Sequence, residues 1–345
     1  MTLFNMKLTV LVLSAFVFFS QFSQAQQLDP VLDKFAAVYE QELGTTKGCE
    51  WPEESTFRVC SEALKNEGNA PYILHHGRVT DKTVVLFHGL SDSPFFFKTI
   101  AAALFEQGSN VVVALLPGHG KKEADTDMQD PQLAARWSEH LSQVMALSAG
   151  LGDEMYIGGF STGGVLAAQY VLNNPKKAKG LLLFSGALAL ESKVESMANI
   201  WGMKWLAKVL DGDYQSIGRN PYKYPSVAAY SAMQLTDVIF DVRELLDQKG
   251  GIDIPIFSAH SAADATTPIT GVRNLIAVNK NKSILFEIPL ELDVCHANVV
   301  VSQTQLIEMN FDKTGLEDFQ PCDVPGANPM HSEMLVALLA FMQAD

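Results

Sequence analysis

Short apolar runs alternate along this chain with longer segments in which apolar residues recur at helical spacing. The short runs have the length and the flanking turn residues of buried strands, whereas the longer segments predict amphipathic helices. The predicted strands are residues 71–75, 82–87, 110–115, 155–157, 180–185, 254–259 and 283–288. The predicted helices are residues 31–43, 100–106, 137–149, 165–172, 270–278 and 331–343. This alternation predicts an α/β fold whose mostly parallel central sheet is covered by helices on both faces.

One interval of about sixty residues, between Ser185 and Ile254, breaks the alternation. It has helical character, with a second amphipathic run at residues 228–246. Its first half carries bulky apolar side chains, namely Met197, Ile200, Trp201, Met203, Trp205, Leu206, Val209 and Leu210. An insertion this late in the sheet predicts a helical cap, residues 191–250, over the carboxyl ends of the strands, where open α/β sheets bind ligands. Ordinary core packing is the alternative role for the same side chains.

Residues 155–173 join a strand to a helix through a glycine-rich turn. Within this segment, Gly159-Phe160-Ser161-Thr162-Gly163 has the G-x-S-x-G form of a nucleophile elbow. A serine in such a strained turn needs neighbours without side chains, and it then projects its hydroxyl above the sheet beside a helix N-terminus. Ser161 is therefore the candidate nucleophile.

A serine hydroxyl needs a histidine base, and the histidine needs a carboxylate that fixes its tautomer. In the fold that carries a nucleophile elbow, the order along the chain is serine, acid, histidine. Asp264 follows the strand predicted at 254–259 and is expected at the same rim of the sheet as Ser161. His296 follows the last predicted strand directly and is favoured as the base. His331, which opens the final helix, is the alternative.

Acyl transfer also needs N–H groups that bind the developing oxyanion. The amide of Thr162, immediately after the nucleophile, is one candidate. The amide of Leu90 is the other, because Gly89 lets the chain turn there after the second predicted strand. Phe95 and Phe96 follow in the same loop, and as candidate substrate-binding residues they favour a hydrophobic acyl group.

Residues 1–25 have the pattern of an export signal. Lys7 supplies the positive start, residues 8–19 are apolar, and Ser23-Gln24-Ala25 presents small residues before a cleavage point. The mature chain is expected to begin near Gln26 and to reside in a periplasm or outside the cell. The apolar segment is too short for a comfortable bilayer span, so no stable membrane anchor is expected.

The four cysteines lie in two neighbouring pairs, Cys49 with Cys60 around a polar loop and Cys295 with Cys322. In an oxidising compartment the pairing of neighbours is the simplest connectivity, with four buried free thiols as the alternative. The formal net charge of −14, without a Lys/Arg cluster, argues against a nucleic-acid partner. No cofactor and no metal are expected, because no C-x-x-C spacing occurs and the acidic residues at 123–130 read as a solvated loop.

Three motifs together resemble the α/β-hydrolase superfamily: Phe87-His-Gly-Leu-Ser-Asp-Ser-Pro94, Leu116-Pro-Gly-His-Gly120 and Gly158-Gly-Phe-Ser-Thr-Gly-Gly164. The nearest branch is the monoacylglycerol lipase/carboxylesterase and serine aminopeptidase-like group. The resemblance runs from about Pro71 onward. It implies a Ser–Asp–His hydrolase that acts through an acyl-enzyme, with a helical cap shaping the acyl pocket.

The first functional hypothesis is a secreted carboxylic-ester hydrolase with a small ester or lipid-like substrate. In it Ser161 attacks, His296 carries the proton and Asp264 orients the imidazole, while the Leu90 and Thr162 amides hold the oxyanion. A peptidase or amidase on the same scaffold is one alternative. A binding protein that keeps the fold without chemistry is the other.

Overall fold

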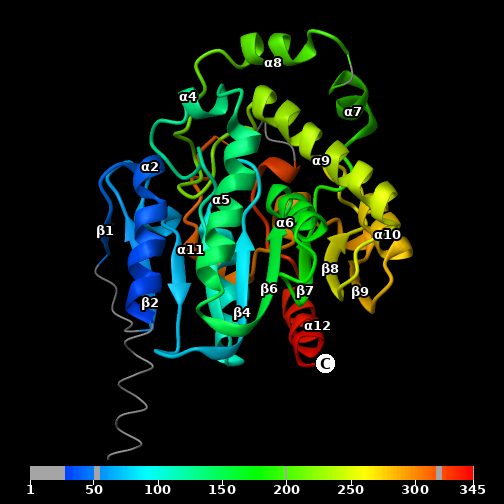
Figure 1. Cartoon of the computed structure of the whole chain (residues 1–345). Coiled ribbons are helices and arrows are strands. Elements are labelled where there is room, and N and C mark those ends of the chain that lie inside the picture. Colours follow the sequence, from blue (N-terminus) through cyan, green and yellow to red (C-terminus); the bar gives the residue numbers. More distant parts are fainter. Residues whose placement is uncertain (1–27, 50–54, 199, 316–320, 345) are drawn as a thin grey trace, which may run out of the picture.

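The computed structural model describes residues 28–49, 55–198, 200–315 and 321–344 (Figure 1). At its centre the described residues form a nine-stranded sheet in the order β1-β2-β3-β5-β4-β6-β7-β8-β9. The strands are β1 (Lys47–Gly48), β2 (Thr56–Cys60), β3 (Tyr72–Leu74), β4 (Thr80–Phe87), β5 (Asn110–Ala114), β6 (Gly152–Phe160), β7 (Gly180–Phe184), β8 (Ile256–Ser261) and β9 (Ser283–Ile288). All pairs from β5 across to β9 are parallel, and only the edge pairs from β1 to β5 are antiparallel. The predicted mostly parallel sheet is confirmed.

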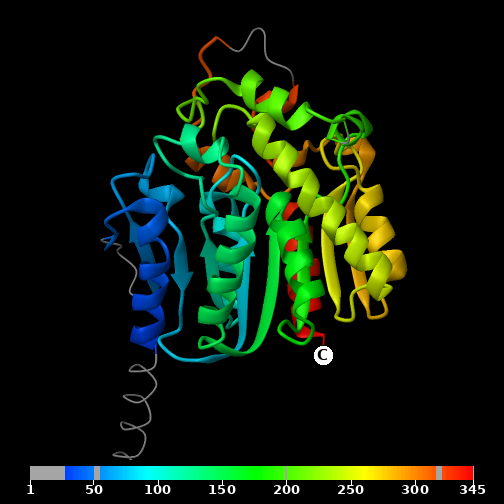
Figure 2. The ribbon, with the colours of Figure 1, turned by 45° about the horizontal axis from the view of Figure 1, so that its top comes forward.

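Helices cover both faces of this sheet (Figures 1 and 2). The helical residues are 28–38, α2 (Glu40–Leu43), α3 (Lys98–Glu106), α4 (Asp125–Met128), α5 (Leu133–Ser148), α6 (Thr162–Asn173), α7 (Ser192–Ala198), α8 (Met203–Asp211), α9 (Ala229–Lys249), α10 (Thr270–Val278), α11 (Gln303–Glu308) and α12 (His331–Gln343). Strand β4 shows how both faces become core. Val85 and Phe87 pack in one apolar cluster with α5, α6, α9 and α10, whereas Val84 and Leu86 pack in a second cluster with α3 and α12. A strand buried on both faces is apolar at successive positions, which is why these strands appear as continuous apolar runs.

The segment between β7 and β8 divides into two structurally different parts. Helix α9 packs along α5 and α6, and Val238, Ile239 and Val242 belong to the core. Helices α7 and α8 arch outward beyond α9 at the end of the molecule where the parallel strands end (Figures 1 and 2). Residues 191–250 therefore combine a core helix with an outer arch.

The N-terminal part holds strands that the apolar pattern did not predict. The stretch around Cys49 and Cys60 was expected to be a polar loop, but β2 lies within it and pairs with β3. β2 also pairs with the two-residue strand β1 across the Cys49–Cys60 disulfide, whose Cα atoms are 5.4 Å apart. The second expected disulfide, Cys295–Cys322, is present as well.

The proposed export signal at residues 1–25 lies outside the described residues. Within the described ranges, no helix has the length and apolar character required to cross a membrane.

Candidate active site

Ser161 sits in a strained turn between β6 and α6. It follows the last residue of β6, precedes the first residue of α6, and has φ 50° and ψ −113°. A non-glycine residue at positive φ is costly and persists only where the surroundings hold it. Here the Ser161 amide donates to the carbonyl of Phe184 at 3.0 Å, and the Ser161 carbonyl accepts from the amides of Gly164, Val165 and Ala187. These bonds hold the bend that the G-x-S-x-G pattern predicts.

The glycines around Ser161 are required by close backbone approaches. A Cβ on Gly163 would overlap the carbonyl of Phe87, at the end of the neighbouring strand β4. A Cβ on Gly159 would overlap the backbone of Gly163 itself. Both positions therefore need glycine so that α6 can begin this close to the sheet. This agrees with the expectation that the serine turn needs neighbours without side chains.

Asp264 and His296 are brought together from separate loops. Asp264 lies just after β8 and is 5% exposed, and His296 opens a short 3-10 turn, His296–Asn298, after β9. His296 Nδ1 is 2.6 Å from Asp264 Oδ2. An ionised carboxylate only accepts hydrogen bonds, so this contact places the proton of the neutral imidazole on Nδ1. Nε2 is then the nitrogen that can take up a proton.

Hydrogen bonds hold the Asp264 carboxylate in its charged form. The amides of Thr266 and Thr267 donate to Oδ1 at 3.0 and 2.9 Å, and the Thr267 hydroxyl donates to Oδ2 at 3.0 Å. Burial raises the pKa of Asp264, but the electrostatic interaction with His296 and the hydrogen bonds from His260, His296 and Thr267 lower it more. The carboxyl pKa therefore lies well below its ordinary value, and the group stays ionised at neutral pH.

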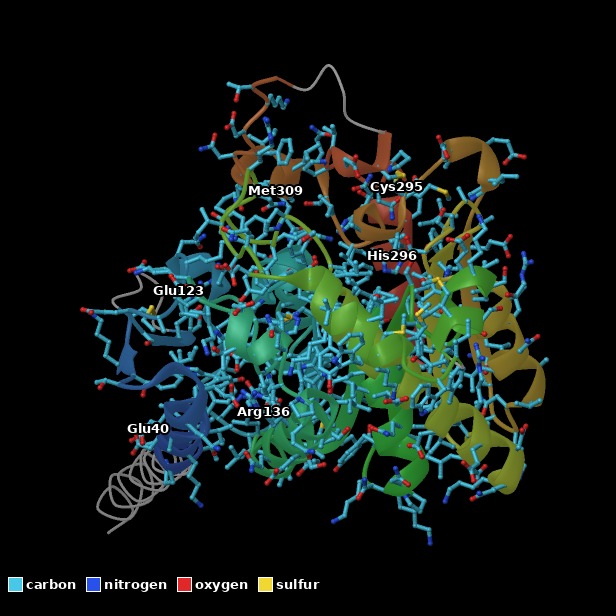
Figure 3. All side chains as sticks on the ribbon, turned by 90° about the horizontal axis from the view of Figure 1, so that it is seen from above. Glu40, Glu123, Arg136, Cys295, His296 and Met309 are labelled. Atoms are coloured by element: carbon cyan, nitrogen blue, oxygen red, sulfur yellow. A yellow bond between two sulfur atoms is a disulfide. The ribbon has the colours of Figure 1, made fainter. Side chains whose placement is uncertain are left out.

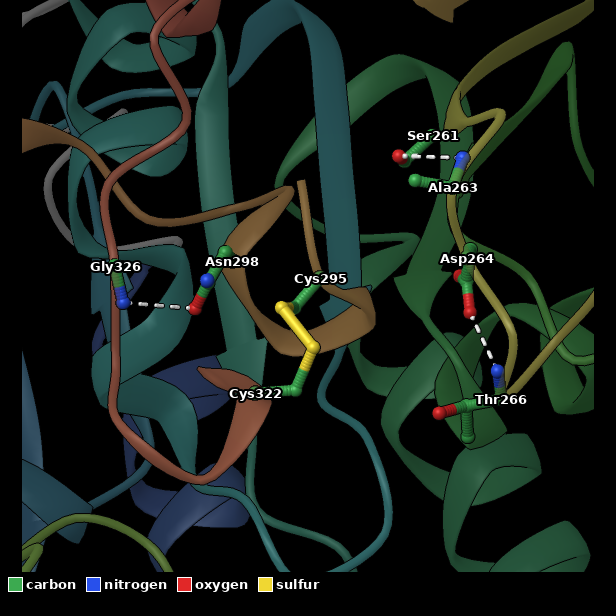
Figure 4. The surroundings of a disulfide bond; sticks show 8 residues. All are labelled: Ser261, Ala263, Asp264, Thr266, Cys295, Asn298, Cys322 and Gly326. Carbon is green, nitrogen blue, oxygen red and sulfur yellow. Dashed lines mark hydrogen bonds between the residues drawn. A yellow bond between two sulfur atoms is a disulfide. The ribbon is translucent and has the colours of Figure 1, made fainter. Parts of the chain in front are cut away.

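The loop that carries His296 is tied down at two points (Figure 4). The Cys295–Cys322 disulfide anchors the residue next to His296, and the Gly326 amide donates to Asn298 Oδ1 at 3.0 Å. In the view from above, Cys295 and His296 lie beside each other (Figure 3). The ring of Phe160, the residue before Ser161, lies 4.8 Å from the His296 ring between centroids. The candidate nucleophile and base therefore belong to the same end of the sheet.

The alternative histidine, His331, occupies a different environment. It is the first residue of α12, and its Nε2 lies 3.3 Å from the Thr99 hydroxyl on α3. Burial lowers its pKa. Within the described ranges no hydrogen bond links it to Asp264, whereas His296 makes that contact directly.

The two candidate oxyanion amides lie at the ends of neighbouring strands. Thr162 is the first residue of α6, so its N–H has no partner within the helix. Leu90 follows β4, whose last residue is in register with Gly159 of β6. A Cβ on Gly89 would come within 2.7 Å of the Phe160 ring, so the turn before Leu90 also depends on glycine.

Phe95 and Phe96 are both buried, within the 3-10 turn Pro94–Phe97. The Phe95 ring stacks on Tyr222 with centroids 3.6 Å apart and planes 2° from parallel. Phe96 meets Phe95 edge-on at 5.8 Å. The apolar wall near the Leu90 loop therefore includes Tyr222, from the segment between α8 and α9, which the sequence patterns did not single out.

Tyr222 belongs to a strap, residues 220–224, that crosses the loop of Leu90. Lys223 Nζ lies 3.0 Å from Oδ1 of the buried Asp92, and the Tyr224 amide donates to the carbonyl of Ser91 at 2.8 Å. The Tyr224 hydroxyl donates to the carbonyl of Gly118 at 3.0 Å. The strap thereby joins the motif segments 87–94 and 116–120. This connection is seen only in the three-dimensional contacts.

His260 and Thr267 are two further residues at the site without a predicted role. His260 is fully buried at the end of β8, with Nε2 2.7 Å from the Thr267 carbonyl and 3.4 Å from Asp264 Oδ2. Both residues hold Asp264 in place. The sequence does offer one indication of this role, because His260 and Thr267 lie within four residues of Asp264, directly after a predicted strand.

Comparisons with known proteins agree with this fold. The model of the family described as "Serine aminopeptidase, S33" matches residues 78–287. A structure described with LipS and LipT, two metagenome-derived lipolytic enzymes, superimposes with a TM-score of 0.53 at 18% identity, over 66% of this chain and 91% of that chain. The monoacylglycerol lipase of Paleococcus ferrophilus gives 0.50 at 19% identity, over 75% and 93% of the two chains.

A third structure, DcsB in complex with its substrate analogue, gives a TM-score of 0.52 at 12% identity and covers 87% of this chain and 98% of that chain. At these identities the likeness shows the fold alone. No curated protein sequence matches the chain. The family match spans more than half of the chain and agrees with the observed sheet, so the chain belongs to the S33 serine aminopeptidase-like family of α/β-hydrolases.

Proposed function

We propose that the protein is a serine hydrolase that cleaves carboxylic esters with a hydrophobic acyl group through an acyl-enzyme. The observation that carries this proposal is the 2.6 Å contact between His296 Nδ1 and Asp264, at the end of the sheet where Ser161 is held in its strained turn. A histidine with one nitrogen on a buried carboxylate and the other free to take a proton is the base that a serine hydroxyl requires.

In the proposed reaction Ser161 Oγ attacks the ester carbonyl while His296 Nε2 takes the hydroxyl proton. The Asp264 carboxylate stabilises the imidazolium that forms, and it remains ionised because its pKa is held low. The amides of Leu90 and Thr162 stabilise the oxyanion. His296 then protonates the leaving alcohol, and a water activated by the same histidine releases the acid and restores Ser161.

The preference for an apolar acyl group is supported by the side chains near the Leu90 loop. The buried Phe95 and Phe96 form an aromatic group there with the half-buried Tyr222. Apolar walls supply most of the contact area in small-ligand sites. We propose that Phe95 and Phe96 contact the acyl chain, with Tyr222 holding the Phe95 ring.

The family description favours one further candidate, a peptidase or amidase. An amide needs protonation of a poorer leaving group, which the same His296 would have to deliver. The two activities separate when an aminoacyl amide is compared with the matching ester. If the amide were turned over faster than the ester with the same acyl group, the protein would be a peptidase or amidase and the esterase proposal would be wrong.

The two disulfides also support the proposal that the protein is exported, since such bonds persist in oxidising compartments. N-terminal sequencing of protein recovered from the periplasm or the medium tests this. A mature N-terminus near Gln26 is expected, and an intact Met1 in exported material would contradict the signal assignment.

Two measurements test the chemistry. A fluorophosphonate probe should label folded protein at Ser161 but not the Ser161→Ala variant, and a chain-length series of nitrophenyl esters should show a preference for longer acyl groups. His296→Ala should lower kcat by several orders of magnitude, while His331→Ala should leave most of it. Absence of labelling would favour a binding protein without chemistry, and a reversed histidine result would move the base to His331.

A further inference from the structure

Helix α8 meets the body of the protein through a polar face. The inward positions are Lys204, Ala207, Lys208 and Asp211, spaced as one helix stripe. Lys204 Nζ lies 2.6 Å from Asp237 Oδ1 on α9, and Lys208 Nζ donates to the carbonyl of Gln129 at 2.9 Å. Asp211 accepts the amides of Ala229 and Tyr230 at 2.6 and 2.7 Å, and so caps the start of α9.

The opposite face of α8 is apolar and points into solvent. Trp205 is 70% exposed, Val209 55% and Leu210 72%, and Trp201, two residues before the helix, is 98% exposed. An amphipathic helix in a globular protein normally turns its apolar stripe toward the core. In α8 the polar contacts of the inner face hold the helix the other way round, so its apolar face lies on the surface of the protein.

We propose that this face, Trp201 and the outer residues of α8, docks on the surface of an electrically neutral phospholipid bilayer. Tryptophan is enriched at bilayer–water interfaces, and a helix with one apolar face lies in the plane of such an interface. Helix α8 lies at the outer edge of the fold (Figures 1 and 2), a position that suits contact with a flat and deformable surface. The formal net charge of −14 opposes anionic lipid, which leaves a zwitterionic surface as the matching partner.

A second copy of the chain fits this face less well. Two such faces, each one helix wide and about 14 Å long, meet along a single line. Such a contact buries less than the roughly 800 Å² per partner of specific protein interfaces. Two copies would also bring together chains of the same large negative charge.

Docking through α8 would turn the end of the sheet that holds Ser161 and His296 toward the lipid. The parallel strands end on the side of the molecule where α8 arches (Figure 1). The proposal itself concerns binding only, and it stands whether or not the protein hydrolyses esters.

The test is co-flotation of the purified full chain with phosphatidylcholine vesicles, together with tryptophan fluorescence. The chain has four tryptophans, of which Trp137 is fully buried, so the exposed indoles of Trp201 and Trp205 should report insertion by a blue shift. The double variant Trp201→Ser/Trp205→Ser should weaken binding at least about tenfold, the scale expected when indoles no longer leave water. Leu210→Ser should weaken it in the same direction.

Matched controls come from equally exposed apolar residues elsewhere. Ile307→Ser on α11 and Val336→Ser on α12 replace side chains that are 71% and 70% exposed and should leave binding unchanged. Ser161→Ala should also bind as the wild type does, which separates docking from catalysis. Circular dichroism and thermal unfolding of each variant confirm that it folds.

Retained binding at about 1 M NaCl would support an apolar contact, because charge attraction is screened there. The proposal is overturned if the chain does not float, if the controls lose binding as the double variant does, or if binding requires anionic lipid and disappears with salt. It is also overturned if sedimentation shows a dimer that the Trp201→Ser/Trp205→Ser variant abolishes, since a second copy would then cover the face.

Discussion

His140 makes the stability of the protein sensitive to acid in a way that a single substitution should reveal. Its side chain lies on α5 with 4% exposure, and its ring meets Tyr39 edge-on at 5.0 Å. Burial lowers its pKa to about 4, against a weaker opposing effect of a hydrogen bond to the backbone of Leu115. The folded protein therefore keeps this histidine neutral at pH values where the unfolded chain has already taken up a proton.

The magnitude follows from the two pKa values. Between about pH 6.5, the ordinary histidine pKa, and about 4, the unfolded state binds more protons than the folded state, so stability rises with pH across that window. At about pH 5 the His140 contribution to the loss, relative to about pH 7, is about 2 kcal/mol. Below about pH 4 both states are protonated, and this contribution no longer changes.

Urea unfolding of the wild type and of His140→Gln, each at about pH 7 and about pH 5, measures this difference. Glutamine does not titrate, so the variant should lose about 2 kcal/mol less on acidification than the wild type does. Its own cost at neutral pH cancels in the comparison. Burial lowers the pKa values of His88 and His119 as well, so the variant should keep part of the acid sensitivity. Equal losses in the two proteins would refute the assignment.

Three further changes have expected results. Asp264→Asn should lower kcat for esters about 10³- to 10⁴-fold in steady-state assays, because His296 loses the partner that fixes its tautomer, and a smaller effect than tenfold would contradict that role. Replacing Cys295 and Cys322 by serine removes a cross-link between residues 27 positions apart and should lower the free energy of unfolding in urea by about 3–4 kcal/mol. An unchanged urea midpoint would show that other contacts hold the loop. Gly163→Ala places a methyl group against the end of β4 and should cost more than about 3 kcal/mol in thermal unfolding, unlike Gly44→Ala, where no atom lies within 4 Å and only the positive φ is strained.

The central sheet could be predicted because its strands are apolar on both faces. Runs such as the one that became β4 have no helical period and are bounded by turns, so their type and order along the chain are readable. Strand β2 was not predicted in this way. It contains Arg58, 7% exposed, whose Nη1 donates to the backbone carbonyl of Glu67 at 3.0 Å. A charged residue that is buried against a backbone carbonyl nine positions away looks, in sequence alone, like part of a polar loop.

The contact between Asp264 and His296 could be predicted because the residues after parallel strands meet at one rim of the sheet. That rule placed Asp264 and His296 together without any knowledge of the connecting segments. This rule does not predict contacts that inserted segments make. The strap at 220–224 has no regular period, and its stacking of Tyr222 on Phe95 and its pairing of Lys223 with Asp92 depend on how the insertion returns over the sheet.

The two halves of that insertion show what apolar periodicity does and does not determine. Both α8 and α9 have an apolar stripe, and the pattern alone assigns both to core or to a ligand pocket. α9 follows the rule, whereas the exposed stripe of α8 contradicts the expectation that its bulky residues pack in the core. Periodicity defines a face but not what the face meets. The missing information was in the other stripe, because Lys204, Lys208 and Asp211 repeat at helical spacing and each finds a polar partner on the protein body. A helix whose charged stripe is the one with specific partners is oriented by that stripe, and its apolar face then remains on the surface of the protein.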